Sequence, residues 1–137
     1  MTDRTPSEEE LKNADTVQAI LLEIPDLIVR RDQPDIFSVE DPETGIILII
    51  DAEPHVISIF ADVAQVPNKG REPFYERLLT LNGQTVHGAF YTDQGHVFIM
   101  ENLEAENLDA NELIAAIKSM MLAIVQLDNA LAGSSAA

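Results

Sequence analysis

Three histidines and many carboxylates are the side chains here whose types could support catalysis or metal binding. His55, His87 and His96 could each act in acid/base chemistry, or ligate a metal together with Asp or Glu. None of them has the short spacing that is typical of metal ligands, although His87 and His96 flank one turn. We therefore favour half-exposed strand histidines and expect no metal ion, while an enzyme with a site dispersed around these histidines is the alternative.

The other residues that commonly carry chemistry lack the necessary context. Ser7, Ser38, Ser58 and Ser119 are not part of a nucleophile elbow, and the six glycines form neither GxGxxG nor a phosphate-binding GxxxxGK[ST] loop. The absence of cysteine excludes a thiolate nucleophile, a disulfide and a Cys-ligated metal. We expect no catalytic residue, no bound cofactor and no enzymatic activity.

The net charge of the chain restricts the kinds of partner that we expect it to bind. The 137 residues include 8 Lys and Arg against 24 Asp and Glu, a formal charge of −16, and 46% of residues are hydrophobic. That apolar content suffices for a folded core, whereas phosphate backbones and anionic lipid surfaces are bound mainly by Lys and Arg. The first residues, MTDRTPSEEELK, do not resemble an export signal. We expect a cytoplasmic, acidic protein that binds neither nucleic acid nor membrane.

The few basic residues are clustered along the sequence. Arg30, Arg31, Lys69, Arg71 and Arg77 make up five of the eight. They could contact an acidic partner, but local pairing on an acidic surface is the interpretation that we favour.

Three amphipathic segments predict helices. Ser7 and Glu10 fit a capping box at the start of the first helix, which Pro25 must end. A second helix is predicted from about Pro73 to Asn82-Gly83, with a left-handed residue at its end. The third begins at Asp109 and carries two apolar rows, which suit packing on a sheet.

Between these helices, apolar runs bounded by turn formers predict strands. The runs are Leu27–Arg31, Ile36–Glu40, Ile46–Asp51, His55–Val63, Thr85–Tyr91 and His96–Glu101. The last two are joined by Thr-Asp-Gln-Gly, a strong hairpin pattern. Ile46–Ile50 is apolar on both faces, which predicts a central strand covered on both sides. Leu27–Arg31 is short and ends in two arginines, so an irregular lead-in is the alternative to a strand there.

These elements predict an α+β fold: an antiparallel sheet of about five strands flanked by three helices, in the order α-β-β-β-α-β-β-α. We find no repeat, linker or composition shift, and therefore expect one domain over residues 1–137, with frayed ends at about 1–6 and 132–137.

The second predicted helix and the last hairpin carry more large apolar residues than one buried stripe needs. Phe74, Tyr75, Leu78, Leu79 and Leu81 fall within eight residues, and the hairpin adds Phe90, Tyr91, Phe98 and Met100. This surplus is either internal packing or the interface of a homodimer formed through the helix and a neighbouring strand. We favour the dimer, because two-fold dimers are the commonest assembly and would cover the second face of the sheet.

Several short sequence segments resemble those of the class I type III secretion chaperones of the CesT (Tir chaperone) family, and the related YbjN-like group is similar. These segments are Phe74-Tyr-Glu-Arg-Leu-Leu-Thr-Leu-Asn82, Gly88-Ala-Phe90, Gly95-His-Val-Phe98 and Leu108-Asp-Ala-Asn-Glu-Leu-Ile114. The match covers roughly residues 70 to 127 by motif. These motifs are hydrophobic patterns and contain no invariant catalytic residue, so they indicate the fold more strongly than the function.

The resemblance implies a non-catalytic homodimer that holds a segment of a partner polypeptide, without ATP, against apolar patches of its first helix and sheet. By position, the implied partner contacts are Leu11, Val17, Leu21, Ile57 and Ile59. The implied dimer contacts are Phe74, Leu78, Leu81 and Phe90. The alternative is a regulatory or small-ligand-sensing domain of the YbjN-like kind.

Overall fold

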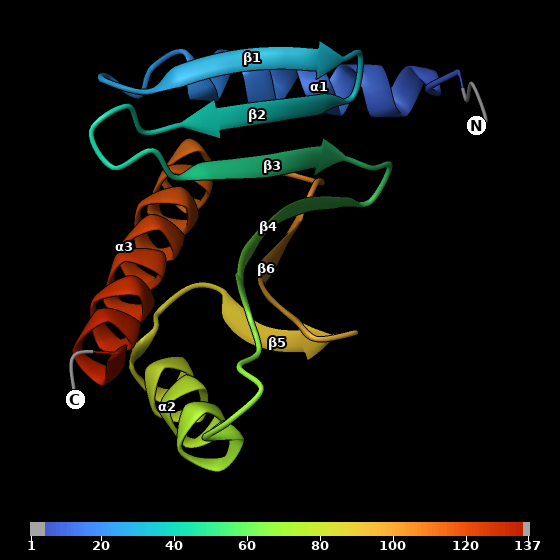
Figure 1. Ribbon diagram of the computed structural model, residues 1–137. Coiled ribbons are helices and arrows are strands. Elements are labelled where there is room, and N and C mark those ends of the chain that lie inside the picture. Colours follow the sequence, from blue (N-terminus) through green and yellow to red (C-terminus); the bar gives the residue numbers. More distant parts are fainter. Residues whose placement is uncertain (1–4, 136–137) are drawn as a thin grey trace. The chain divides into compact units, whose positions relative to one another are not determined.

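The structure is a computed structural model that describes residues 5–135 (Figure 1). In chain order its elements are α1 (Glu8–Leu21), β1 (Ile28–Gln33), β2 (Ile36–Glu40), β3 (Ile47–Ala52), β4 (Val56–Gln65), α2 (Arg71–Gln84), β5 (Ala89–Asp93), β6 (His96–Glu104) and α3 (Ala110–Ser135). Three helices and an antiparallel six-stranded sheet over these residues confirm the predicted α+β class. The segment that begins at Leu27 does contain a strand, β1, so the order is α-β-β-β-β-α-β-β-α.

The strands lie in the order β1-β2-β3-β4-β6-β5. The chain divides into two compact units. The first contains the residues through Ile59 together with Asn102–Ile114, and the second contains Phe60–Glu101 and the residues from Ala115 onward. β4, β6 and α3 contribute residues to both units. Residues 1–4 and 136–137 of the expected frayed ends lie outside the described residues.

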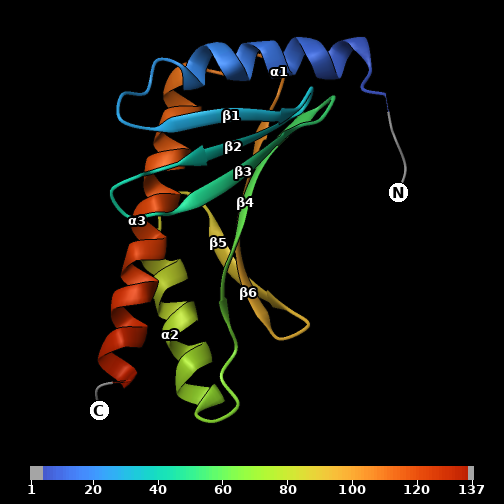
Figure 2. The same ribbon diagram turned by 45° about the horizontal axis from the view of Figure 1, so that its top comes forward.

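In the first unit, α1 covers one face of the strands β1 to β3 (Figure 2). The antiparallel register places Phe37 opposite Ile50 and Val39 opposite Leu48, and these four side chains are fully buried. Alternation along each strand brings such residues to one face, where an amphipathic helix can cover them. The helix and its neighbours supply further buried residues of this core: Ala14, Val17, Ile20, Leu21, Ile24, Ala52, Ile57, Ile59 and Leu113.

Local hydrogen bonds fix where α1 begins. The Ser7 hydroxyl accepts from the Glu10 N–H at 3.1 Å, and Glu10 Oε1 accepts from the Ser7 N–H at 2.8 Å. The predicted capping box is therefore present.

Side chains then hold α1 against its surroundings in the same unit. Asn13 Nδ2 donates to the carbonyls of Glu53 and Pro54, at 2.9 and 3.0 Å. Arg31 Nη1 donates to Asp15 Oδ1 at 3.0 Å and to Gln18 Oε1 at 2.8 Å. Arg31 is thus paired locally, as we favoured for this arginine, and it connects β1 to α1.

The second face of β3 is less covered than its sequence predicted. Leu48, Ile50 and Ala52 are fully buried, but Ile47 is 45% exposed and Ile49 is half-buried. Within the described residues, the cover predicted for both faces is therefore only partial on this side.

In the second unit, β5 and β6 form the predicted hairpin. They pair antiparallel from Ala89 with Met100 to Asp93 with His96, and Gln94 and Gly95 have φ of 49° and 82°. Two successive left-handed residues are typical of the tight turn that matches the twist of paired strands.

The end of α2 differs from the sequence prediction. Asn82 and Gly83 lie inside the helix, which continues to Gln84 before an extended Thr85. The Asn82 side chain has another role: its Nδ2 donates to the Phe90 carbonyl at 3.1 Å, and its Oδ1 accepts from the Phe90 N–H at 2.7 Å. Asn82 therefore joins α2 to β5 instead of terminating the helix.

Helix α3 is long and apolar. By length and composition alone its stretch Ala110–Leu131 could cross a membrane, a test that the core helix of a soluble protein also passes. Ile117, Met120 and Leu127 are fully buried, as expected for a core helix.

Candidate functional site

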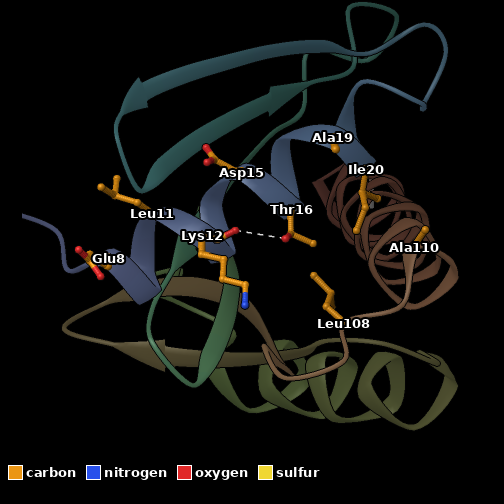
Figure 3. A pocket seen from close by; sticks show the side chains of 9 residues that line it. All are labelled: Glu8, Leu11, Lys12, Asp15, Thr16, Ala19, Ile20, Leu108 and Ala110. Atoms are coloured by element: carbon orange, nitrogen blue, oxygen red, sulfur yellow. Dashed lines mark hydrogen bonds between the residues drawn. The ribbon is translucent and has the colours of Figure 1, made fainter.

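A shallow groove of about 770 Å³ lies beside α1 in the first unit (Figure 3). It is open to solvent and mostly apolar. Its lining residues come from α1, from the segment before α3 and from the first turn of α3: Glu8, Leu11, Lys12, Asp15, Thr16, Ala19, Ile20, Leu108 and Ala110.

The groove follows from the spacing of residues on α1. The lining residues form two adjacent rows of four-residue spacing, Glu8-Lys12-Thr16-Ile20 and Leu11-Asp15-Ala19. Side chains four apart lie one above the other on a helix surface, so each row forms a stripe along α1. Ala14, Val17 and Leu21 fall on the opposite stripe and are fully buried. The helix thus has a core face and a second, partly apolar face.

Small side chains keep the groove hollow. Ala19 and Ala110 are the short side chains near Ile20 at one end of the groove, and Thr16 lies opposite Leu108 (Figure 3). The Thr16 hydroxyl donates to the Lys12 carbonyl at 3.1 Å, so it has a partner within the helix. Leu11 remains 36% exposed.

A second hollow of about 940 Å³ adjoins this groove in the same unit, because the two share Lys12, Thr16 and Leu108. Its other lining residues are more polar: Glu9, Asn13, Pro54, His55, Val56, Glu104, Ala105, Glu106 and Asn107. Together the two hollows are lined by the carboxylates of Glu8, Glu9, Asp15, Glu104 and Glu106, and by one ammonium group, that of Lys12. The apolar groove therefore has a strongly acidic border.

The three histidines lie in separate places. His55 lines the polar hollow of the first unit. In the second unit His87 Nδ1 is 3.3 Å from Glu101 Oε2, and His96 Nδ1 is 3.1 Å from Asp62 Oδ2. The register of β5 and β6 puts His96 beside the turn and His87 near the other end of the hairpin. Among the described residues, no group of three or more His, Cys, Asp or Glu side chains is placed to hold a metal ion.

One serine lies close to a histidine without forming a nucleophilic pair. The Ser119 hydroxyl accepts from the His87 backbone N–H at 3.0 Å and lies 3.3 Å from the His87 carbonyl, so it engages the backbone. Glu101 Oε2 also accepts from the Gly88 N–H at 3.0 Å. These bonds fix residues 87 and 88 beside α3.

The residues assigned to partner binding by resemblance occupy two environments. Leu11 lines the groove and is partly exposed, whereas Val17, Leu21, Ile57 and Ile59 are fully buried. A partner could reach these four only if they left the core of the first unit. Their role stays a prediction.

The residues assigned to a dimer interface lie inward in the second unit. The side chains of these four residues are buried: Phe74, Leu78, Leu81 and Phe90. Their neighbours in sequence face solvent: Tyr75 is 38%, Leu79 70% and Tyr91 42% exposed. A contact between copies through this region would use the outward-facing residues first.

Sequence reasoning missed Leu108, Ala110 and Ala19 as lining residues of the groove. A four-residue spacing on the polar side of α1 marks Ala19 and Leu11, and no local pattern marks Leu108. Its place depends on the fold, which brings the segment before α3 beside α1 (Figure 3).

Comparison with known proteins identifies one matching family. The family model CesT_Tir_1 matches residues 10–136. No curated protein matches. Among solved structures, an uncharacterized protein from Methanothermobacter thermautotrophicus is similar, with a TM-score of 0.68 and 16% sequence identity over 89% of this chain and 98% of that chain. At this identity the likeness concerns the fold alone.

Proposed function

Because the chain belongs to the CesT_Tir_1 family, we propose that it is a non-catalytic binding module that holds a segment of a partner polypeptide in the α1 groove, and that it works as a homodimer. The open apolar groove between α1 and Leu108 is the observation that carries the proposal. Exposed apolar surface of this kind is typical of sites where a protein binds another chain.

Charge supports the same role. A groove that is empty between partners favours aggregation, and like charges on different copies oppose it. The formal charge of −16 on 137 residues supplies that repulsion. We infer that the acidic composition keeps the free module soluble in the cytoplasm.

The experiment is affinity capture from the native host followed by mass spectrometry, with two leucine variants. Leu11→Asp places a carboxylate in the groove, and Leu22→Asp places one just beyond α1, where Leu22 is 69% exposed and does not line the groove. We expect one polypeptide to be retained by the wild type and by Leu22→Asp and lost by Leu11→Asp. No retained polypeptide, or equal retention by both variants, would contradict the proposal.

A regulatory or small-ligand-sensing role is the second candidate, and the polar hollow around His55 favours it. A small molecule bound there would raise the melting temperature by mass action, and His55→Ala would reduce that shift. A small-molecule screen that finds no such shift removes this candidate.

A further inference from the structure

We propose that the segment held in the α1 groove is a basic amphipathic α-helix of about three turns. The inference deepens the proposed function and rests on it, because it names the chemistry of the polypeptide that the groove receives.

The elements around the groove favour a helix over an extended segment. The lining residues belong to α1, to the segment before α3 and to the first turn of α3, and none belongs to a strand. An extended segment there finds no strand edge to pair with, so its backbone N–H and C=O groups would lose water over an apolar floor without gaining partners. A helix satisfies these groups internally.

The dimensions match a short helix. The groove follows α1 from Glu8 to Ile20, which is about 18 Å at the rise of an α-helix. An incoming helix of about 12 residues spans that distance. Its apolar residues must recur every three or four positions to face Leu11, Ala19 and Leu108 together.

Charge complementarity selects a basic helix. Glu8 and Asp15 border the groove, and Glu9, Glu104 and Glu106 border the adjoining hollow. Asp15 is already paired with Arg31 at 3.0 Å, so part of its charge is compensated within the chain. The four glutamates still outnumber the single cation, Lys12, and lysines or arginines flanking the apolar stripe of the ligand would face them.

Lys12 lets the proposal predict the direction in which a charge substitution changes the binding affinity. It lines both hollows and is the one cation among their lining residues. Removing its charge should strengthen binding of a basic helix, whereas removing a charge from Glu8 or Glu106 should weaken it. A purely hydrophobic groove would respond to none of these changes.

Fluorescence anisotropy with synthetic helical peptides tests the inference on the full chain. Two peptides of about 14 residues carry the same leucines at three- and four-residue spacing and differ only in having lysine or glutamate at the flanking positions. A third carries lysines and a central proline, which breaks a helix. We expect the lysine peptide to bind at least about tenfold more tightly than the glutamate peptide, because several exposed charges each change affinity by up to about fivefold. It should exceed the proline peptide by a similar factor, because proline inside a helix costs about 3 kcal/mol.

Charge variants and salt complete the test. With the lysine peptide, Lys12→Gln should bind about two- to fivefold more tightly, and Glu106→Gln more weakly by a similar factor, as expected for exposed charges. Raising the salt from 0.05 to 0.5 M should reduce both the affinity and these differences. Leu11→Asp should abolish binding and Leu22→Asp should not.

The possible failures of the two proposals differ. Equal or tighter binding of the glutamate or proline peptide overturns the basic helix, as does a Lys12→Gln variant that binds no better. If the host polypeptide is nevertheless captured through Leu11, the proposed function stands and only this inference fails. If no peptide binds and no host polypeptide is captured, both fail.

Discussion

At the scale of single residues, one glycine is fixed by two separate requirements. Gly88 has a φ of +87°, which side chains of L-residues rarely adopt. A Cβ built there would lie 2.9 Å from Met120 Cγ and 3.4 Å from Ile99 Cδ1. Space and backbone conformation therefore both demand glycine, at the point where residues 87 and 88 approach α3.

We predict that Gly88→Ala lowers the free energy of unfolding by about 2–4 kcal/mol, from backbone strain together with overpacking. Gly95→Ala is the matched control, because Gly95 has a similar φ of +82° with nothing within 4 Å of its built Cβ. It should cost only about 1–2 kcal/mol. Equilibrium urea denaturation compares the two, and equal losses would show that the contact with Met120 relaxes without cost.

A second residue, Asn82, shows what a sequence pattern can and cannot specify. Asn-Gly commonly ends a helix, so Asn82-Gly83 predicted a terminus. The structure uses the Asn82 amide to bond both backbone groups of Phe90, eight residues away. A side-chain amide has the same donor and acceptor pair as a backbone unit, but nothing in the sequence tells which backbone unit it bonds.

Replacing Asn82 by Ala should cost about 1–3 kcal/mol, because the N–H and C=O of the buried Phe90 lose their side-chain partners. Thr80→Ala in the same helix should be near neutral, since that exposed hydroxyl donates only to the Glu76 carbonyl of its own helix. Hydrogen exchange followed by NMR should show faster exchange of the Phe90 amide in Asn82→Ala alone. Unchanged protection would mean that another group satisfies this amide.

At the scale of elements, α1 contributes both to the stability of the first unit and to the lining of the groove. Its cap fixes the first turn, which carries Glu8 and precedes Leu11, and its opposite stripe supplies Val17 and Leu21 to the core. We predict that Ser7→Ala lowers the free energy of unfolding by about 1 kcal/mol, since the Glu10 N–H loses its acceptor. Thermal or urea unfolding measures this loss.

The same substitution distinguishes local from global effects. Ser7→Ala should increase hydrogen exchange mainly in the first turn of α1, because the other hydrogen bonds of the helix and its tether through Asn13 are untouched. Thr16→Ala is the control, with a change within about 0.5 kcal/mol, because Thr16 bonds only to the carbonyl of Lys12. A Ser7→Ala protein as stable as the wild type would show that water replaces the cap.

Local signals predicted these elements well, and contacts between distant segments explain the differences. The capping box, the hairpin turn and the helix periodicities depend on neighbours in sequence, and all three recur in the structure. By contrast, the apolar residues Val17 and Ile57 look alike whether they face a core or a partner, and only the packing of α1 on the sheet buries them. Leu108 lies in a connecting segment, so no periodicity could assign it to the groove.

At the scale of the whole molecule, the outward-facing apolar residues of the second unit support the proposed homodimer. Tyr75 and Leu79 project from α2, and Val86, 83% exposed, follows this helix. Their neighbours Phe74, Leu78 and Leu81 are buried within a single chain, and their assignment to the dimer interface stays a prediction. A two-fold contact through α2 would bury the same leucine from both copies, because each surface meets itself.

We predict that the wild type has twice the chain mass of 15.1 kDa by size exclusion with light scattering. Leu79→Asp should have the mass of one chain, because a two-fold contact would place two carboxylates in the same apolar patch. Leu22→Asp removes a leucine of nearly equal exposure, 69% against 70%, from the first unit and should leave the dimer intact.

The Leu79→Asp protein should remain folded, because Leu79 lies on the surface. At low concentration its circular dichroism and melting temperature should resemble those of a wild-type monomer. A monomeric wild type, or a Leu79→Asp protein that remains dimeric, would move the contact away from α2 and leave its exposed leucine without a role in assembly.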